Sequence, residues 1–190
     1  MADEPVEDAA ADAREETHEP EPELLHGVPV SWSRGQQVLH PTREQLLATM
    51  QALHDDGYLM CVDVTAVDYL TYGRRTAAEG DIVLTERTVP GGQAAERFKV
   101  VYGLLSHRDR ARIRVRVQVP ADDPVVPSLF TLHPGTEALE REVFDMFGIS
   151  FTDHPDLTRI LMPEDWIGHP LRKDYSSGRI PVQFKGAPSS

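Results

Sequence analysis

The sequence predicts an α+β fold: a single domain with a largely antiparallel sheet and helices packed on it, followed by an extended proline-rich C-terminal arm. Three observations lead to this fold class. Strand patterns at residues 97–106 and 112–119 flank a short polar turn, which is typical of an antiparallel hairpin. Helical patterns cover residues 42–57 and 136–148, and beyond residue 151 proline and glycine interrupt regular structure. A chain of 190 residues holds one domain with a real core, and hardly two.

The first 24 residues are the most acidic part of the chain. Residues 1–25 hold ten acidic residues and one basic residue, which accounts for −9 of the net charge of −12. This segment has almost no large apolar side chain, so burial cannot offset the entropy lost on ordering. We expect residues 1–24 to be a disordered acidic tail, with docking on a basic partner as the alternative. Because the remaining chain is close to neutral, nucleic-acid binding is excluded.

The folded domain is expected over residues 25–150, and its first helix follows a capping box. Thr42 and Gln45 stand three residues apart, so each side chain can bind the backbone amide of the other residue. Large apolar residues then follow at helical spacing and give the helix an apolar stripe: Leu46, Leu47, Met50 and Leu53. Gly57 is expected to end the helix.

A mostly buried strand is predicted at residues 58–69, with Asp63 and Asp68 at its polar positions. It contains the single cysteine of the chain, Cys61, which we interpret as a buried and inert thiol. One cysteine excludes an internal disulfide. It also excludes iron–sulfur ligation by this chain alone, because a cluster typically takes four thiolates.

The strand at residues 112–119 alternates strictly between apolar residues that face a core and long polar residues that face outward. The inward set is Ile113, Val115, Val117 and Val119, and the outward set is Arg112, Arg114, Arg116 and Gln118. Two interpretations of the arginines stay open: a basic docking stripe, or the solvated face of a half-covered sheet. Residues 107–110 are expected to form the hairpin turn, and residues 71–96 mainly a long loop with a short extra strand at 81–84.

The second helix is expected to begin at Thr136 and to end at Gly148. Its apolar face consists of Leu139, Val143, Met146 and Phe147. Glu137, Arg141 and Asp145 follow one another at four-residue spacing, so they line one ridge of the helix, where they can pair.

Residues 151–190 are expected to form an extended docking arm. These forty residues contain five prolines and three glycines, which forbid regular structure over most of this length. The arm nevertheless keeps many large apolar residues: Leu157, Ile160, Leu161, Met162, Trp166, Ile167, Leu171, Tyr175 and Phe184. A segment this apolar is no solvated linker and needs a surface on which to lie.

Acidic residues and histidines around the second helix allow two catalytic interpretations. Glu140, Glu142 and Asp145 resemble acid–base carboxylates, but Glu140 and Glu142 point about 200° apart on a helix. His154 and His169 could serve a metal-dependent hydrolase, but they stand fifteen residues apart and each precedes a proline. The hydrolase is kept as a remote alternative. The sequence contains no glycine-rich phosphate loop after a strand and no nucleophile elbow.

Residues 140–174 resemble the signature of a known family. The matching positions, in order and spacing, are Glu140, Arg141, Glu142, Asp145, Phe147 to Ile149, Phe151, His154 to Leu157, Arg159 to Leu161 and Gly168 to Asp174. The pattern is similar to that of the 30 kDa subunit family of NADH-quinone oxidoreductase (respiratory complex I). Upstream segments are similar too, so the likeness covers roughly residues 40–176. Ala138 and His133 stand where the family often has Trp.

The resemblance implies a compact α+β domain with a mixed, largely antiparallel sheet covered by helices. It also implies a non-catalytic structural subunit in the peripheral arm of a proton-translocating complex. The complex uses FMN, iron–sulfur clusters, NADH and a quinone, and none of these is bound by this chain. The implied partners are the quinone-site large subunit (49 kDa type) and the subunit that carries the terminal iron–sulfur cluster. The implied location is the cytoplasmic side of the cell membrane, reached through the complex, since no apolar run approaches the roughly 20 residues that cross a bilayer. The alternative is the equivalent subunit of a related membrane-bound hydrogenase or F420H2 dehydrogenase.

We expect ten residues of the signature to form the subunit interface. They are Glu140, Arg141, Asp145, His154, Arg159, Trp166, His169, Leu171, Arg172 and Lys173. The charged members are expected to fix the helix and dock the arm, while Trp166 and Leu171 bury apolar area against a neighbour.

Overall fold

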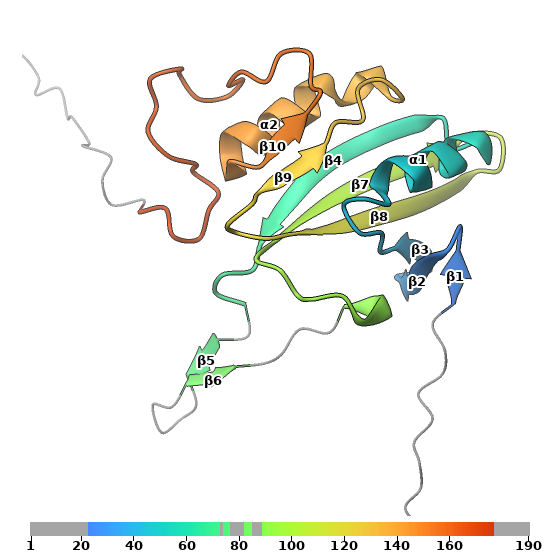
Figure 1. Cartoon of the computed structure of the whole chain (residues 1–190), viewed down its shortest axis with the longest axis horizontal. Coiled ribbons are helices and arrows are strands. Elements are labelled where there is room, and N and C mark those ends of the chain that lie inside the picture. The colour runs from blue at the N-terminus through green and yellow to red at the C-terminus, as the bar shows by residue number, and fades with distance from the viewer. Residues whose placement is uncertain (1–22, 73, 77–81, 85–88, 177–190) are drawn as a thin grey trace, which may run out of the picture.

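The structure, a computed structural model, describes residues 23–72, 74–76, 82–84 and 89–176. Its main sheet has the strand order β1-β2-β3-β8-β7-β4, and all neighbours are antiparallel except β3 and β8, which are parallel. The strands are β1 (Leu24–Leu25), β2 (Val28–Ser33), β3 (Gln36–Leu39), β4 (Met60–Asp68), β7 (Phe98–Ser106) and β8 (Ala111–Val119). Two helices, α1 (Leu46–Asp55) and α2 (Glu137–Phe147), accompany the sheet (Figure 1). The predicted α+β domain with a mixed, largely antiparallel sheet is confirmed.

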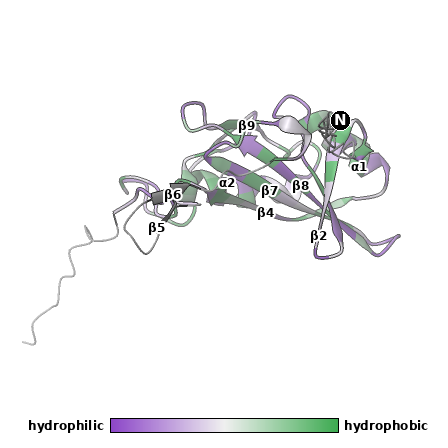
Figure 2. Ribbon diagram, turned by 90° about the horizontal axis from the view of Figure 1, so that it is seen from below, coloured by the Kyte–Doolittle hydropathy of each residue, from purple (hydrophilic) through white to green (hydrophobic). Residues whose placement is uncertain are grey.

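Both helices pack on one face of this sheet. Alternate residues of a strand face opposite sides, so each long strand gives every second residue to the core. Hydrophilic and hydrophobic colours alternate along the long strands in Figure 2. The buried cluster joins Ile113, Val115, Val117 and Val119 of β8 and Phe98, Val100, Tyr102 and Leu104 of β7 with Leu46, Met50 and Leu53 of α1 and Val143, Met146 and Phe147 of α2. The inward-facing residues predicted for β8 and for α2 are therefore confirmed.

The remaining side chains of β8 point to the opposite face, which we call the outer face. Arg112 is exposed there, and Arg114 and Arg116 are half-buried. Gln118 was expected to face outward but is buried, because the chain that enters β7 folds over it. The amide of Glu96 donates to Gln118 Oε1 at 3.3 Å. The hairpin that joins β7 and β8 forms as predicted and pairs Ser106 with Ala111 next to the turn.

The capping box before α1 is formed. The amide of Thr42 donates to Gln45 Oε1 at 3.0 Å, and the amide of Gln45 donates to Thr42 Oγ1 at 3.3 Å. These bonds hold a turn just ahead of the helix, which itself begins at Leu46. Gly57, with a φ of 102°, follows its C-terminal end as expected. Leu47 does not belong to the buried stripe and is 49% exposed.

The strand predicted at residues 58–69 is present as β4, but the prediction that it is mostly buried is wrong. β4 lies at the edge of the sheet, so half of its side chains meet solvent, and Met60 and Val62 are 45% and 44% exposed. Asp68, expected at a polar position, is instead buried. Cys61 is partly buried against the core, and burial raises the pKa of its thiol to about 12, which keeps it protonated and inert.

Strands β1 to β3 were not predicted. Arg34 and Gly35 both have positive φ, of 53° and 73°, and make the tight turn between β2 and β3. The amide of Val30 donates to the carbonyl of Glu23 at 2.8 Å, so Glu23 and Leu24, assigned to the disordered tail, are paired with the sheet. The rest of the predicted tail lies outside the described residues.

Short elements complete the chain. Within the predicted loop at 71–96, β5 (Arg74–Thr76) and β6 (Ile82–Leu84) form an antiparallel pair, and a 3-10 turn, η1, covers Pro90–Gly92. A second 3-10 turn, η2 (Pro134–Thr136), precedes α2. β9 (Val125–Pro127) and β10 (Ser150–Thr152) pair in parallel, so the first two residues of the predicted arm belong to the domain. Among the described residues, no helix has the length and apolar character that crossing a membrane requires.

Candidate functional site

Helix α2 and the segment that follows β10 contain all ten residues predicted for the interface. We call residues 153–176 the arm. Helix α2 ends at Gly148, whose φ of 69° is a left-handed value that glycine adopts without strain. The last turn of α2 contains no basic residue, so the helix has no cation of its own near its free carbonyl groups. The arm supplies these cations from a distance along the chain.

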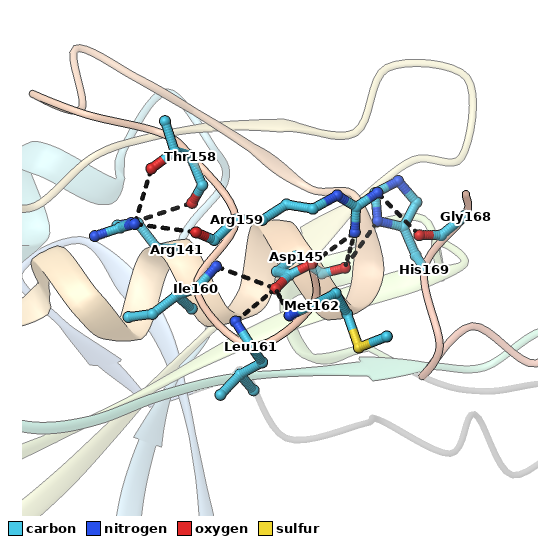
Figure 3. Close-up of polar contacts among 9 residues, drawn as sticks. All are labelled: Arg141, Asp145, Thr158, Arg159, Ile160, Leu161, Met162, Gly168 and His169. Atoms are coloured by element: carbon cyan, nitrogen blue, oxygen red, sulfur yellow. Dashed lines mark hydrogen bonds and ion pairs between the residues drawn. The ribbon is translucent and has the colours of Figure 1, made fainter. Parts of the chain in front are cut away.

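Asp145 is the centre of the contact between α2 and the arm (Figure 3). Its side chain is fully buried, and its Oδ2 accepts hydrogen bonds from three successive backbone amides, those of Ile160, Leu161 and Met162, at 3.1, 2.8 and 2.8 Å. Its Oδ1 accepts from Arg159 Nη1 at 2.6 Å. Burial alone would raise the pKa of Asp145, but these donors lower it below the usual value. The arm is therefore fastened to the helix by a charged carboxylate.

The ion pairs predicted along the ridge of α2 do not form among Glu137, Arg141 and Asp145. The guanidinium of Arg141 instead donates to the carbonyl of Thr158 at 3.1 Å, to its hydroxyl at 2.8 Å and to the carbonyl of Arg159 at 3.0 Å. The arm offers several fixed acceptors to Arg141 and four donors to Asp145, which a single helical neighbour could not match. Arg141 and Asp145 on this ridge therefore bind the arm and not each other.

The C-terminal carbonyl groups of α2 are capped by the signature's second half. His169 Nδ1 donates to the carbonyl of Asp145 at 3.0 Å, and the amide of Leu171 donates to the carbonyl of Met146 at 3.0 Å. The guanidinium of Arg172 donates to the carbonyls of Phe147 and Gly148. Burial lowers the pKa of His169, so its ring is neutral and its proton lies on Nδ1. These bonds satisfy groups that a helix end otherwise leaves open.

The absence of a side chain at Gly148 makes this cap possible. A Cβ built there would lie 2.5 Å from His169 Nε2 and 2.6 Å from Arg172 Nη2. The glycine is therefore required both by its backbone conformation and by the close approach of the arm.

The far end of the arm is tied to the sheet. The amide of Lys173 donates to Asp68 Oδ2 at 2.8 Å, and Arg97 Nη2 lies 2.8 Å from carboxylate oxygens of both Asp68 and Asp174. Burial alone would raise the pKa of Asp68, but hydrogen bonds from Arg97 and from the amides of Lys173 and Leu70 lower it. The side chain of Lys173 itself is exposed.

Glu140 lies inside the domain and has no direct access to a partner. Its side chain is fully buried, where it accepts from Ser128 Oγ at 2.5 Å and from the amide of Leu129 at 2.8 Å. Burial raises the pKa of Glu140, and these hydrogen bonds offset the rise in part. Glu142 on the same helix is exposed, so the two carboxyl groups diverge as the helical geometry predicts.

The two histidines bind opposite ends of α2. His154 Nε2 donates to the carbonyl of Glu137 at 3.0 Å, and its Nδ1 accepts from the amide of Asp156 at 3.1 Å. This tautomer is neutral, so the 4.0 Å approach of Nε2 to Glu140 is no ion pair. The carbonyls of Glu137 and Asp145, bound by His154 and His169, are eight residues and thus about 12 Å apart along the helix. This separation contradicts the hydrolase alternative, which requires both histidines at one metal.

Apolar side chains of the arm face away from the domain. Ile160, Leu161, Ile167 and Leu171 are 41%, 60%, 89% and 49% exposed, whereas Leu157 and Met162 pack against the core. Trp166 is half-buried, and its indole N–H is buried without a hydrogen-bond partner among the described residues. The fastened arm thus exposes four large apolar side chains.

Sequence reasoning missed Asp68 and Arg97 as partners of the arm. The contact between Asp68 and Lys173 joins residues 105 positions apart, and no local pattern connects them. Gly148 was recognised as a helix end, but its closeness to His169 and Arg172 could not be read from the sequence.

The chain is similar to known proteins over most of its length. A family model described as "Respiratory-chain NADH dehydrogenase, 30 Kd subunit" matches residues 39–180. The C subunit of NADH-quinone oxidoreductase from Saccharopolyspora erythraea is 42% identical over 161 residues, which cover 83% of this chain and 56% of that protein. The protein of the same name from Salinispora arenicola is 40% identical over 183 residues, which cover 95% of this chain and 65% of that one. The chain thus spans less than two thirds of the length of these relatives.

Two solved structures share the fold. A structure described as Nqo5 of the trypsin-resistant fragment (1–134) has a TM-score of 0.55 and 34% identity, and covers 69% of this chain and 90% of that one. The membrane-bound sulfane sulfur reductase, an archaeal respiratory membrane complex, contains a chain with a TM-score of 0.55 and 18% identity, covering 86% of this chain and 89% of that one. At 18% identity the second likeness shows the fold alone. The family match and the identity to the two bacterial relatives show that the chain belongs to the family of the 30 kDa subunit of respiratory-chain NADH dehydrogenase.

Proposed function

We propose that this protein is a structural subunit of the peripheral arm of a proton-translocating NADH-quinone oxidoreductase on the cytoplasmic side of the cell membrane. In this role it supports the large subunit that forms the quinone site and the subunit that carries the terminal iron–sulfur cluster. Family membership supports the assignment to the complex. The iron–sulfur clusters would be bound by other subunits, since a chain with one cysteine cannot supply the four thiolates that a cluster typically takes. The resemblance to the family implies the same for FMN, NADH and the quinone.

The observation that carries the structural role is the fastened arm. Most of its polar signature residues are bound by the chain's own helix and sheet, while four of its large apolar side chains are exposed: Ile160, Leu161, Ile167 and Leu171. An exposed set of large apolar residues on a pre-ordered segment is typical of a protein interface. Pre-ordering also lowers the entropy lost when the partner binds.

This arrangement changes the proposed role of the ten residues. Arg159, His169 and Arg172 act on assembly by holding the arm in place, and Leu171 with its exposed neighbours makes the contact. Glu140 and Asp145 act from inside the domain. Replacing Arg159 or Arg172 with Ala should therefore deplete the assembled complex by releasing the arm.

The experiment that tests the proposal replaces exposed apolar residues of the arm in the full chain. Ile167→Ser and Leu161→Ser are compared with Leu47→Ser, which alters an equally apolar residue of α1 that is 49% exposed. Burying one Ile or Leu side chain contributes about 1.5 to 3 kcal/mol, so each arm variant should reduce co-purification with the complex by about tenfold or more. The control should assemble normally.

Turnover separates the structural role from a catalytic one. NADH-dependent quinone reduction is measured per assembled complex in membranes of each variant. The proposal expects fewer complexes with unchanged turnover. Complete assembly with lost turnover, or normal assembly of both arm variants, contradicts it.

A further inference from the structure

The outer face of the sheet, opposite both helices, carries a row of arginines. The strand register places three cross-strand rows on this face: Arg112 with Leu105 and Met60, Arg114 with Gly103 and Asp63, and Arg116 with Val101 and Thr65. The β8 members are the arginines, the β7 members are small or apolar, and the β4 members lie at the sheet edge. The buried cluster contains side chains from the other face, so neither helix covers these rows.

The arginines of this face have no partner of opposite charge among the described residues. No hydrogen bond or ion pair joins the guanidinium of Arg112, Arg114 or Arg116 to another described side chain, although Arg114 and Arg116 are half-buried. Asp63 is the carboxylate in the same row as Arg114, but it lies two strands away, about 9.5 Å, with Gly103 between them. Half-buried cations without a counter-charge are costly in an isolated chain.

Burial and the positive charge of this face lower the pKa of His40, which follows β3. Lys99 is buried on the same side of β7, with its Nζ 5.1 Å from the ring centroid of Tyr69. His40 lies beside Ser31, 2.8 Å from its Oγ, and its pKa falls to about 4 through burial and the positive charges of Lys99 and Arg116. The histidine is therefore neutral, and the face carries a concentrated positive charge on a chain whose net charge is −12.

The spacing of the row selects the chemistry of a partner. Alternate residues of a strand lie about 6.6 to 6.8 Å apart, so the three guanidinium groups start from a regular ladder. Carboxylates four residues apart on a helix rise by about 6 Å, which matches this ladder to within about 1 Å. Val101 and Leu105 run alongside and offer half-buried apolar surface to the rest of such a segment.

We propose that the outer face docks an acidic amphipathic segment of another protein subunit, with its carboxylates over Arg112, Arg114 and Arg116 and its apolar side over Val101 and Leu105. A protein segment fits better than a nucleic acid or an anionic membrane, because the centre of the face needs side chains to pack on it. This surface is separate from the arm, so the inference goes beyond the proposed function.

The test places a photo-cross-linking amino acid at Thr65, which is exposed on the outer face, in the tagged full chain in cells. The same amino acid at Leu47, on α1, is the matched control. The expected result is a cross-link from position 65 to a peptide of another protein that carries at least two carboxylates, with none to that peptide from position 47. The double variant Arg114→Glu/Arg116→Glu should reduce this product at least tenfold, and 1 M salt during irradiation of isolated complexes should weaken it.

Every other result overturns the proposal. These results are a cross-link to residues 1–22 or 73–88 of the same chain, to lipid or to nucleic acid, a partner peptide without carboxylates, or no product at all. If the charge reversal prevents folding, as judged by the circular dichroism of the purified chain, Arg114→Gln/Arg116→Gln replaces it with the same expectation. The arm variants of the proposed function leave this face unchanged, so a failure of either idea is distinguished from a failure of the other.

Discussion

Replacing Asp145 with Asn tests how strongly the arm is held. Asp145→Asn keeps the shape of the side chain but removes its charge. An asparagine whose oxygen stays on the amides of Ile160, Leu161 and Met162 must turn its NH2 group toward Arg159, so two donors face each other. Breaking a buried ion pair in this way costs about 3 to 5 kcal/mol. The arm can also detach and hydrate, which limits the loss to the free energy of arm docking.

Hydrogen exchange at single amides measures this loss. The amides of residues 160–162 should exchange roughly two to three and a half orders of magnitude faster in Asp145→Asn, which is the same free energy expressed as a rate ratio. Amides of the sheet, such as those of Tyr102 and Val115, should keep their exchange rates, because the arm opens without unfolding the core. Asp165→Asn, the same change at an exposed arm residue, is the matched control.

The reasoning is refuted if the three amides exchange as in the parent chain while the variant remains folded. A double-mutant cycle with Arg159→Met sharpens the result, because it isolates the coupling between the carboxylate and the guanidinium. Coupling below about 0.5 kcal/mol would mean that the three amides alone hold the arm.

Three further predictions concern the same region. Gly148→Ala should destabilise the protein by at least about 1 to 2 kcal/mol, since an alanine there adopts a left-handed conformation and meets His169 and Arg172. A lower Tm and faster tryptic cleavage at Arg172 would show this loss of stability. Unchanged cleavage would count against the close approach of the arm to Gly148. Glu140→Gln should change the free energy of unfolding by less than about 1 kcal/mol below the usual carboxyl pKa of 4.5, because there the side chain is protonated and the amide keeps its shape and its hydrogen-bonding groups. Because the pKa is raised, Glu140 contributes its full stabilisation to the folded state below its unfolded pKa, and this stabilisation is lost as pH rises through the folded pKa. The free energy of unfolding of Glu140→Gln, measured by urea titration at several pH values, should lack this part of the pH dependence. The pKa of Asp145 is lowered, so its contribution to the stability of the docked arm is present above the usual pKa of 3.8 and is lost as pH falls through the folded pKa. Hydrogen exchange at the arm amides, corrected for the intrinsic effect of pH, should therefore accelerate below about pH 4 in the parent chain. It should not accelerate in this way in Asp145→Asn.

Local signals in the sequence predicted most of the domain. The alternation of β8, the hairpin turn and the capping box each depend on residues within a few positions of one another, and each is found in the structure. β4 was misjudged because its apolar composition resembles that of a central strand. Whether a strand lies at the edge of a sheet depends on the whole sheet, and the local sequence around Met60 and Val62 does not indicate an edge position.

The candidate site was recognised by its residues but not by its contacts. The signature indicated that Arg141, Asp145 and Arg159 matter together, and periodicity alone suggested ion pairs along the helix. The structure gives these side chains partners fourteen or more residues away. Helical spacing predicts which side chains share a ridge, but it cannot reveal that another segment competes for them.

The capping of α2 by the arm has a consequence for synthesis of the chain. Asp145 leaves the ribosome 14 residues before Arg159, and the carbonyl of Phe147 leaves 25 residues before the guanidinium that binds it. At about 5 to 20 residues per second, α2 therefore waits roughly 1 to 5 seconds for its own cap. During that interval the helix end is open and the domain is incomplete, whereas β7 and β8 pair with each other in one hairpin and their other neighbours, β4 and β3, precede them in the chain. A nascent chain that stops before Arg172 should be a better substrate for proteases and chaperones than its nearly complete sheet would suggest.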